Sequence, residues 1–131
     1  MFDLNTRILV VDDMNTMRKI VIKACREIGF SNFVEAPDGA IAWERLSNSK
    51  DEIGLVISDW NMPNSTGLEL LKNVRTDDGM KAMPFILLTA ESEVVQVKEA
   101  LEAGVDNYIV KPFTTDILKR KLQDTYKKVS A

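Results

Sequence analysis

Short, continuous apolar runs separated by stretches of helical periodicity are the feature of this chain that most constrains its fold. The runs are rich in β-branched and aromatic residues, and they lie at residues 8–11, 55–57, 85–88 and 108–110, with a weaker one at 33–34. Runs without polar alternation are typical of strands that are buried on both faces of a parallel sheet. Because parallel strands need long crossover connections, usually helices, the alternation predicts an α/β fold.

The segments between the runs have the spacing of amphipathic helices. The clearest apolar stripe ends at Gly29, a common helix stop, and consists of Met17, Ile20, Val21, Ala24 and Ile28. Four further helices are expected at residues 39–48, 67–76, 93–103 and 114–129, and the candidate N-caps of the last are Thr114, Thr115 and Asp116. Five strands and five helices joined by right-handed crossovers predict a doubly wound, five-stranded parallel sheet of flavodoxin-like order 2-1-3-4-5.

The composition restricts the chemistry. The 131 residues fit one domain, 1–131, and they include one cysteine, Cys25, and no histidine. An internal disulfide is therefore impossible, and Cys25 is interpreted as a small packing residue. The absence of histidine excludes Ser-His-Asp and Cys-His nucleophilic sites and any metal site that needs imidazole.

The charge is acidic overall and unevenly distributed. The formal net charge is −3, whereas residues 111–131 carry six basic and two acidic side chains, which leaves −7 for residues 1–110. No global attraction to nucleic acid or to an anionic membrane is expected. The apolar runs are shorter than the roughly 18 residues of a membrane span, and the N-terminal residues do not resemble a signal peptide. We therefore expect a soluble, cytoplasmic protein.

Polar side chains follow four of the predicted strands at their carboxyl ends: Asp12 and Asp13, Asp59, Thr89, and Lys111. In open parallel sheets these ends form the functional crevice, although an aspartate in such a place is often only a turn former. Two carboxylates about 4 Å apart repel by about 4 kcal/mol at an effective dielectric of 20. Lys111 supplies one compensating charge, so the cluster predicts a bound cation.

Oxygen ligands without imidazole or thiolate favour a hard divalent ion, Mg²⁺ before the transition metals. Because Mg²⁺ sites are commonly completed by phosphate oxygens, the cluster indicates phosphate chemistry. A flavin mononucleotide site, the alternative for this fold, would have an uncharged loop after the first strand to receive the phosphate. Asp12 and Asp13 would repel that phosphate.

Six short segments resemble the receiver domains of response regulators, and in particular those of single-domain chemotaxis regulators. They are LVVDD at 9–13, TMR at 16–18, SDWNMP at 58–63, GLELL at 67–71, TAE at 89–91 and KPFT at 111–114. Each is short, but together they follow the family's order and spacing from residue 7 to about 128.

The resemblance implies that Asp59 accepts a phosphoryl group from a phosphohistidine on a sensor histidine kinase, or from a small acyl phosphate. A carboxylate nucleophile needs no activating base. By the family pattern, Mg²⁺ is held by Asp13, Asp59 and the backbone carbonyl of Asn61, while Asp12 acts largely through metal-bound water. The chain is thus expected to be a signalling module that catalyses only its own phosphoryl transfer and dephosphorylation.

The remaining site residues are also implied by the resemblance. Lys111, the Thr89 hydroxyl and the Ala90 amide would bind phosphoryl oxygens, and Lys111–Pro112 would be a cis peptide. As Thr89 moves toward the phosphate, the ring of Tyr108 would swing into the vacated space. Without the resemblance, an equally good interpretation is that Tyr108 is only a packing aromatic residue on an edge strand.

Three further residues lie near these positions in the sequence. Asn61 and Glu91 would flank the water that hydrolyses the phosphoaspartate, which predicts a short-lived signal; otherwise they are surface polar residues. Trp60 is expected to be a partly exposed ring whose fluorescence responds to Mg²⁺.

The partners expected from the resemblance are a chemotaxis sensor histidine kinase, the flagellar motor switch protein and a phosphatase, with the protein a monomer. The output face would consist of the fourth helix, the fifth strand and the fifth helix. The chain departs from the best-known chemotaxis members at Glu93 and Val94, where those have lysines, and in the loop 64–67, which lacks the usual acid before Gly67. These departures are expected to affect motor binding but not phosphorylation.

Two other functions remain open at this point. A phosphorelay or phosphate-sink receiver would pass its phosphate to another histidine protein. A Mg²⁺-dependent phosphatase with an aspartyl intermediate would usually place a second acid two residues after the nucleophile, where this chain has Asn61.

Overall fold

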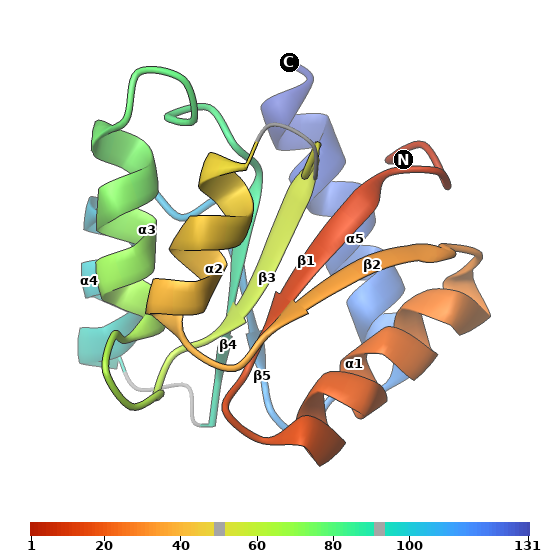
Figure 1. Ribbon diagram of the computed structural model, residues 1–131. Helices are drawn as coiled ribbons and strands as arrows, with labels where there is room; N and C mark the ends of the chain where they lie inside the picture. Colours follow the sequence, from red (N-terminus) through yellow and green to blue (C-terminus); the bar gives the residue numbers. More distant parts are fainter. Residues whose placement is uncertain (49–51, 91–93) are drawn as a thin grey trace.

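The computed structural model describes residues 1–48, 52–90 and 94–131, which form five strands and five helices in alternation (Figure 1). The strands are β1 (Arg7–Val11), β2 (Asn32–Ala36), β3 (Leu55–Asp59), β4 (Phe85–Thr89) and β5 (Asn107–Val110). The helices are α1 (Asn15–Ile28), α2 (Gly39–Ser47), α3 (Gly67–Thr76), α4 (Val94–Glu102) and α5 (Thr115–Val129). All strand pairs are parallel in the order β2-β1-β3-β4-β5, so the predicted fold class and strand order are confirmed.

Helices cover both faces of the sheet, α1 and α5 on one and α2, α3 and α4 on the other (Figure 1). Successive strand residues point to opposite faces, so Ile8 and Val10 enter the core under α1 and α5, whereas Leu9 and Val11 enter the other core. Both layers are apolar, which explains the absence of polar alternation in the runs. No helix in the described part of the chain has both the length and the apolar character of a membrane span.

Local sequence signals account for several helix ends. Thr66 and Glu69 form a capping box at the start of α3, and Thr114 caps α5 by accepting the Ile117 N–H. Gly29, with φ of 127°, ends α1 as predicted.

The predicted stripe on α1 is wrong at one position. Ile20 is 54% exposed, and the buried residues of α1 are Val21, Ala24 and Cys25. Ile20 lies at the margin of the stripe and lines a surface hollow with Pro112 and Phe113 instead of packing beneath the sheet. The packing role of Cys25 agrees with its position in the core, where burial raises the pKa of its thiol to about 12.

The strand register brings the carboxyl ends of the strands to one edge of the sheet. Val11 pairs with Ser58, Asp59 pairs with Leu88, and Thr89 pairs with Val110. Residues that directly follow β1, β3, β4 and β5 therefore emerge side by side at this edge, as the topology predicts.

Candidate functional site

Asp12 and Asp13 occupy the turn between β1 and α1, and their environments differ. Asp12 is 1% exposed, and its Oδ1 accepts the Met14 N–H at 2.9 Å. Its Oδ2 is buried without a hydrogen-bond partner, whereas Asp13 is exposed. Burial is the main reason why the pKa of Asp12 rises from 3.8 to about 6; the carboxylates of Asp59 and Asp13 raise it further, while the Met14 N–H and Lys111 oppose the shift.

Arg18, near the start of α1, holds the turn between β1 and α1 in place. Its Nη1 donates to the backbone carbonyl of Asp12 at 2.6 Å, and its Nε pairs with Glu35 Oε1 at 3.0 Å. The turn is thereby tied to β2. Nothing in the sequence pairs Arg18 with Glu35, so the role of Arg18 is visible only in the structure.

Asp59 is the last residue of β3 and is 8% exposed. Its Oδ1 accepts the Trp60 N–H at 2.9 Å and forms an ion pair with Lys111 Nζ, also at 2.9 Å. Lys111 follows β5, its N–H donates to the Thr89 carbonyl at 2.7 Å, and the Lys111–Pro112 peptide is cis, as the resemblance implies. The ammonium of Lys111 is therefore placed directly on one of the acids.

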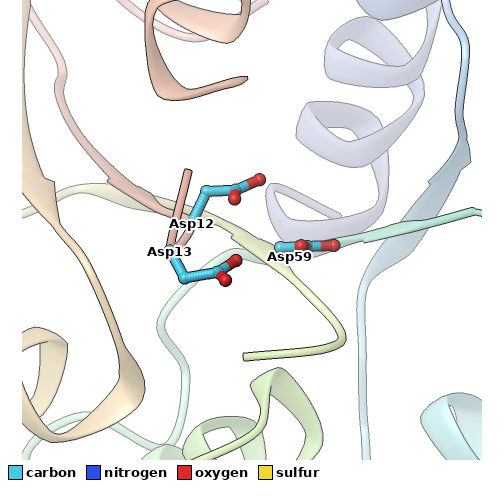
Figure 2. Close-up of side chains that lie close together, drawn as sticks. All are labelled: Asp12, Asp13 and Asp59. Atoms are coloured by element: carbon cyan, nitrogen blue, oxygen red, sulfur yellow. The ribbon is translucent and has the colours of Figure 1, made fainter. Parts of the chain in front are cut away.

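The three carboxylates form one cluster. Asp12, Asp13 and Asp59 each offer an oxygen that lies within 4.8 Å of the other two, and Figure 2 shows the three side chains around a common space. Three carboxyl groups face the Lys111 ammonium, so negative charge is in excess. Together with the unpartnered Oδ2 of Asp12, these oxygens fit a hard divalent cation, as the sequence predicts.

The N-terminus of α3 packs against the backbone of Asp59. The Gly67 N–H donates to the Trp60 carbonyl at 2.9 Å. A Cβ atom at Gly67 would overlap the carbonyl oxygen of Asp59 and would lie 2.8 Å from Leu87 Cδ2. The need for glycine at residue 67 cannot be predicted from the sequence, because it depends on how closely a helix approaches a strand.

Thr89 and Tyr108 are held by side chains from two helices. Thr89 is 3% exposed, and its hydroxyl donates to Gln96 Oε1 on α4 at 3.1 Å. Tyr108 is half-buried on the edge strand β5, with Lys121 Nζ of α5 lying 4.6 Å from its ring centre. The contacts of Gln96 with Thr89 and of Lys121 with Tyr108 are not predicted by the sequence pattern.

The remaining predicted residues have mixed outcomes. Asn61 is exposed two residues after Asp59, while Glu91 and Glu93 lie outside the described residues. The expectation that Trp60 is partly exposed is wrong, because the residue is only 9% exposed and packs in the core beneath α2, α3 and α4. The response of its fluorescence to Mg²⁺ stays a prediction. The chain turns from β3 toward α3 at this point, so the side chain of Trp60 faces inward.

Comparison with known proteins agrees with this geometry. Residues 8–123 match the family model "Response regulator receiver domain". Chemotaxis protein CheY-3 of Vibrio cholerae is 46% identical over 125 residues, which cover 95% of each chain, and chemotaxis protein CheY1 of Helicobacter pylori is 46% identical over 117 residues, 89% of this chain and 94% of the relative. The structure of CheY4 of Vibrio cholerae superimposes with a TM-score of 0.82 at 31% identity, over 92% of this chain and 98% of that one. The chain belongs to the response regulator receiver family, alongside its CheY-type chemotaxis members, and is a signalling module rather than a conventional enzyme.

Proposed function

We propose that this chain, as one receiver domain over residues 1–131, is a chemotaxis response regulator that is phosphorylated on Asp59 by a sensor histidine kinase. The observation that carries the proposal is the cluster of three acids with the Lys111 ammonium paired to Asp59, at the sheet edge where ligands bind in this class of fold. The similarity to chemotaxis proteins supports the choice of signalling pathway.

Asp13, Asp59 and the backbone carbonyl of Asn61 would hold Mg²⁺, with Asp12 acting through a water molecule. The excess negative charge and the unpartnered Oδ2 of Asp12 support this assignment. When bound, Mg²⁺ neutralises charge on the transferring phosphoryl group.

The nucleophile is the Asp59 carboxylate. Both of its contacts, with the Trp60 N–H and Lys111 Nζ, are made by Oδ1. An oxygen of Asp59 bonds to phosphorus as the phosphorus–nitrogen bond of the donor phosphohistidine breaks, which leaves a mixed anhydride on the protein. Lys111 then transfers its hydrogen bond to a phosphoryl oxygen, and the Thr89 hydroxyl and the Ala90 amide bind another.

Phosphorylation of Asp59 adds a charge of about −1.5 to −2, and the interactions of this charge drive the conformational switch. Thr89 gains a charge-assisted hydrogen bond when it turns toward the phosphoryl group, and Tyr108 moves into the space that Thr89 leaves. The output face, or output surface, is formed by α4, β5 and α5. Its partner is the flagellar motor switch protein in the cytoplasm. Coupling of this kind is typically worth about 1 to 3 kcal/mol, enough to change partner affinity several-fold or more.

Incubation with Mg²⁺ and acetyl phosphate tests the acceptor directly. We expect a gain of about 80 mass units, and borohydride reduction followed by peptide mapping should locate it at Asp59. Asp59→Asn should show no gain, whereas Asp78→Asn, which changes a fully exposed acid on a loop, should be labelled like the parent. Absence of labelling, or labelling at another residue, would contradict the proposal.

Binding to the flagellar motor switch protein is tested by a pull-down with the fluoroberyllate-activated protein. We expect enrichment of flagellar switch components that Asp59→Asn does not retain. Enrichment of a histidine phosphotransfer protein instead would indicate a phosphorelay, and repeated turnover of a small phosphate ester would indicate an enzyme. Either result would overturn the motor assignment.

Replacement of Asn61 by arginine should slow the loss of phosphate from Asp59 about tenfold, which corresponds to ~1.4 kcal/mol in the activation barrier. Asn61 is exposed beside the acceptor, and a long cationic side chain there would displace the hydrolytic water. The decay of the phosphorylated protein after removal of acetyl phosphate measures the rate. Asn73→Arg, the same change at an exposed position of α3, is the control, and equal decay rates for the two variants would show that Asn61 does not position water.

A further inference from the structure

The hydroxyl of Thr89 is already engaged before any phosphoryl group is present. It donates to the side-chain oxygen of Gln96 on α4 at 3.1 Å, in surroundings where Thr89 is 3% exposed. A threonine hydroxyl carries a single proton and can make one strong donation at a time. The bond to Gln96 and a bond to a phosphoryl oxygen therefore exclude each other.

The exchange between these two bonds cannot take place by movement of the Thr89 backbone. Thr89 pairs with Val110 in the β4–β5 register, and its carbonyl accepts the Lys111 N–H at 2.7 Å. Because this backbone is fixed between two strands, the exchange has to take place by rotation of the Thr89 side chain away from α4.

We propose that Gln96 is a positioning residue that retains Thr89 in its resting orientation and so sets the threshold for activation. The inference rests on the proposed function, since it takes Thr89 as the residue that binds the phosphoryl group. Gln96 is half-buried on α4, one of the three elements of the output surface. Release of Thr89 also frees the Gln96 amide, so the same exchange alters the surface of α4 when Asp59 is modified.

The strength of this restraint follows from ordinary hydrogen-bond energetics. A neutral hydrogen bond contributes a net factor of about two to ten in an equilibrium constant, and a charge-assisted bond contributes more. The charge-assisted bond to a phosphoryl oxygen is therefore strong enough to replace the bond to Gln96. In the unmodified protein, the bond to Gln96 opposes rotation of the Thr89 side chain. Removal of the acceptor on Gln96 should raise the affinity for a phosphoryl analogue about two- to tenfold.

The test is a double-mutant cycle on fluoroberyllate affinity at saturating Mg²⁺. Gln96→Met preserves the length of the side chain but removes the acceptor, and we expect it to bind fluoroberyllate about two- to tenfold more tightly than the parent. In a Thr89→Val background, Gln96→Met should have no effect, because the hydroxyl that it releases is absent. Gln96→Glu keeps an acceptor and should bind fluoroberyllate no more tightly than the parent.

A spectroscopic signature separates positioning from general loosening of α4. In Gln96→Met without ligand, the methyl resonance of Thr89 and the ring resonances of Tyr108 should shift part of the way toward their positions in the fluoroberyllate complex. Gln123→Met, the same replacement at an exposed position of α5, should leave them unchanged.

The outcomes separate the two proposals. If the parent binds fluoroberyllate and Gln96→Met binds it equally, or if the effect persists in the Thr89→Val background, Gln96 does not restrain Thr89 and the inference is wrong. If neither protein binds fluoroberyllate in the presence of Mg²⁺, the acceptor site itself is wrong, and the inference fails with it.

Discussion

Replacement of Asp12 by asparagine should stabilise the metal-free protein at pH 7 by about 3 kcal/mol. Burial raises the pKa of Asp12 from 3.8 to about 6, so keeping this carboxylate ionised in the folded state costs free energy. Asparagine has nearly the same shape, preserves an acceptor for the Met14 N–H and carries no charge. The gain has the size of the pKa difference, at about 1.4 kcal/mol per unit.

The pH dependence identifies the cause. Because the folded-state pKa of Asp12 lies above its value in the unfolded chain, the folded protein binds more protons between about pH 4 and pH 6. In that window the contribution of Asp12 to the free energy of unfolding falls as pH rises, and above pH 6 it is constant. Urea unfolding in EDTA should therefore show parent and Asp12→Asn with equal stability near pH 4 and a difference that grows up to pH 6.

Mg²⁺ should cancel most of this difference. A ligand that binds only the folded state at a hundred times its Kd stabilises that state by ~3 kcal/mol, and Asp12→Asn should gain less because it should bind Mg²⁺ more weakly. The control is Asp78→Asn, which removes a fully exposed carboxylate and should not change the pH profile. A difference between parent and Asp12→Asn that stays constant from pH 4 to pH 7 would show that burial of this charge is not what destabilises the metal-free protein.

The sequence was most informative where chain topology alone decides position. The sequence predicts that Asp12, Asp59 and Lys111 converge because each lies at the carboxyl end of a strand, and the parallel register brings these ends to one edge. Only the order of the strands is needed to place these residues. The charge excess, and thus the fit to a hard cation, follows directly from the convergence.

The sequence was least informative where the result depends on how a helix is rotated or how closely it packs. Periodicity predicts that α4 exists, but not that Gln96 reaches the hydroxyl of Thr89. The same limit explains why Trp60 is buried and not partly exposed as expected, since it lies in a loop where no periodicity applies. Ile20 is exposed because a stripe defined by spacing alone includes residues at its margin.

Replacement of Gly67 by alanine should destabilise the protein by about 3 kcal/mol or more, even though alanine is the better helix former by about 1 kcal/mol. The added methyl would overlap the carbonyl oxygen of Asp59 and would lie 2.8 Å from Leu87 Cδ2. The Asp59 carbonyl belongs to a buried strand and cannot yield as a flexible side chain would, so α3 has to move away from β3. The free energy of unfolding from urea titration measures the loss.

Gly79→Ala provides the matched control, since a Cβ at this exposed position would meet only Asp77 Oδ1 at 3.3 Å. Its stability should stay within about 0.5 kcal/mol of the parent. Displacement of α3 would also break the hydrogen bond from the Gly67 N–H to the Trp60 carbonyl and so disturb the residue that follows Asp59. Labelling by acetyl phosphate should therefore slow in Gly67→Ala but not in Gly79→Ala. A Gly67→Ala protein as stable as the parent would mean that the approach of α3 to the acceptor strand is not a constraint on this fold.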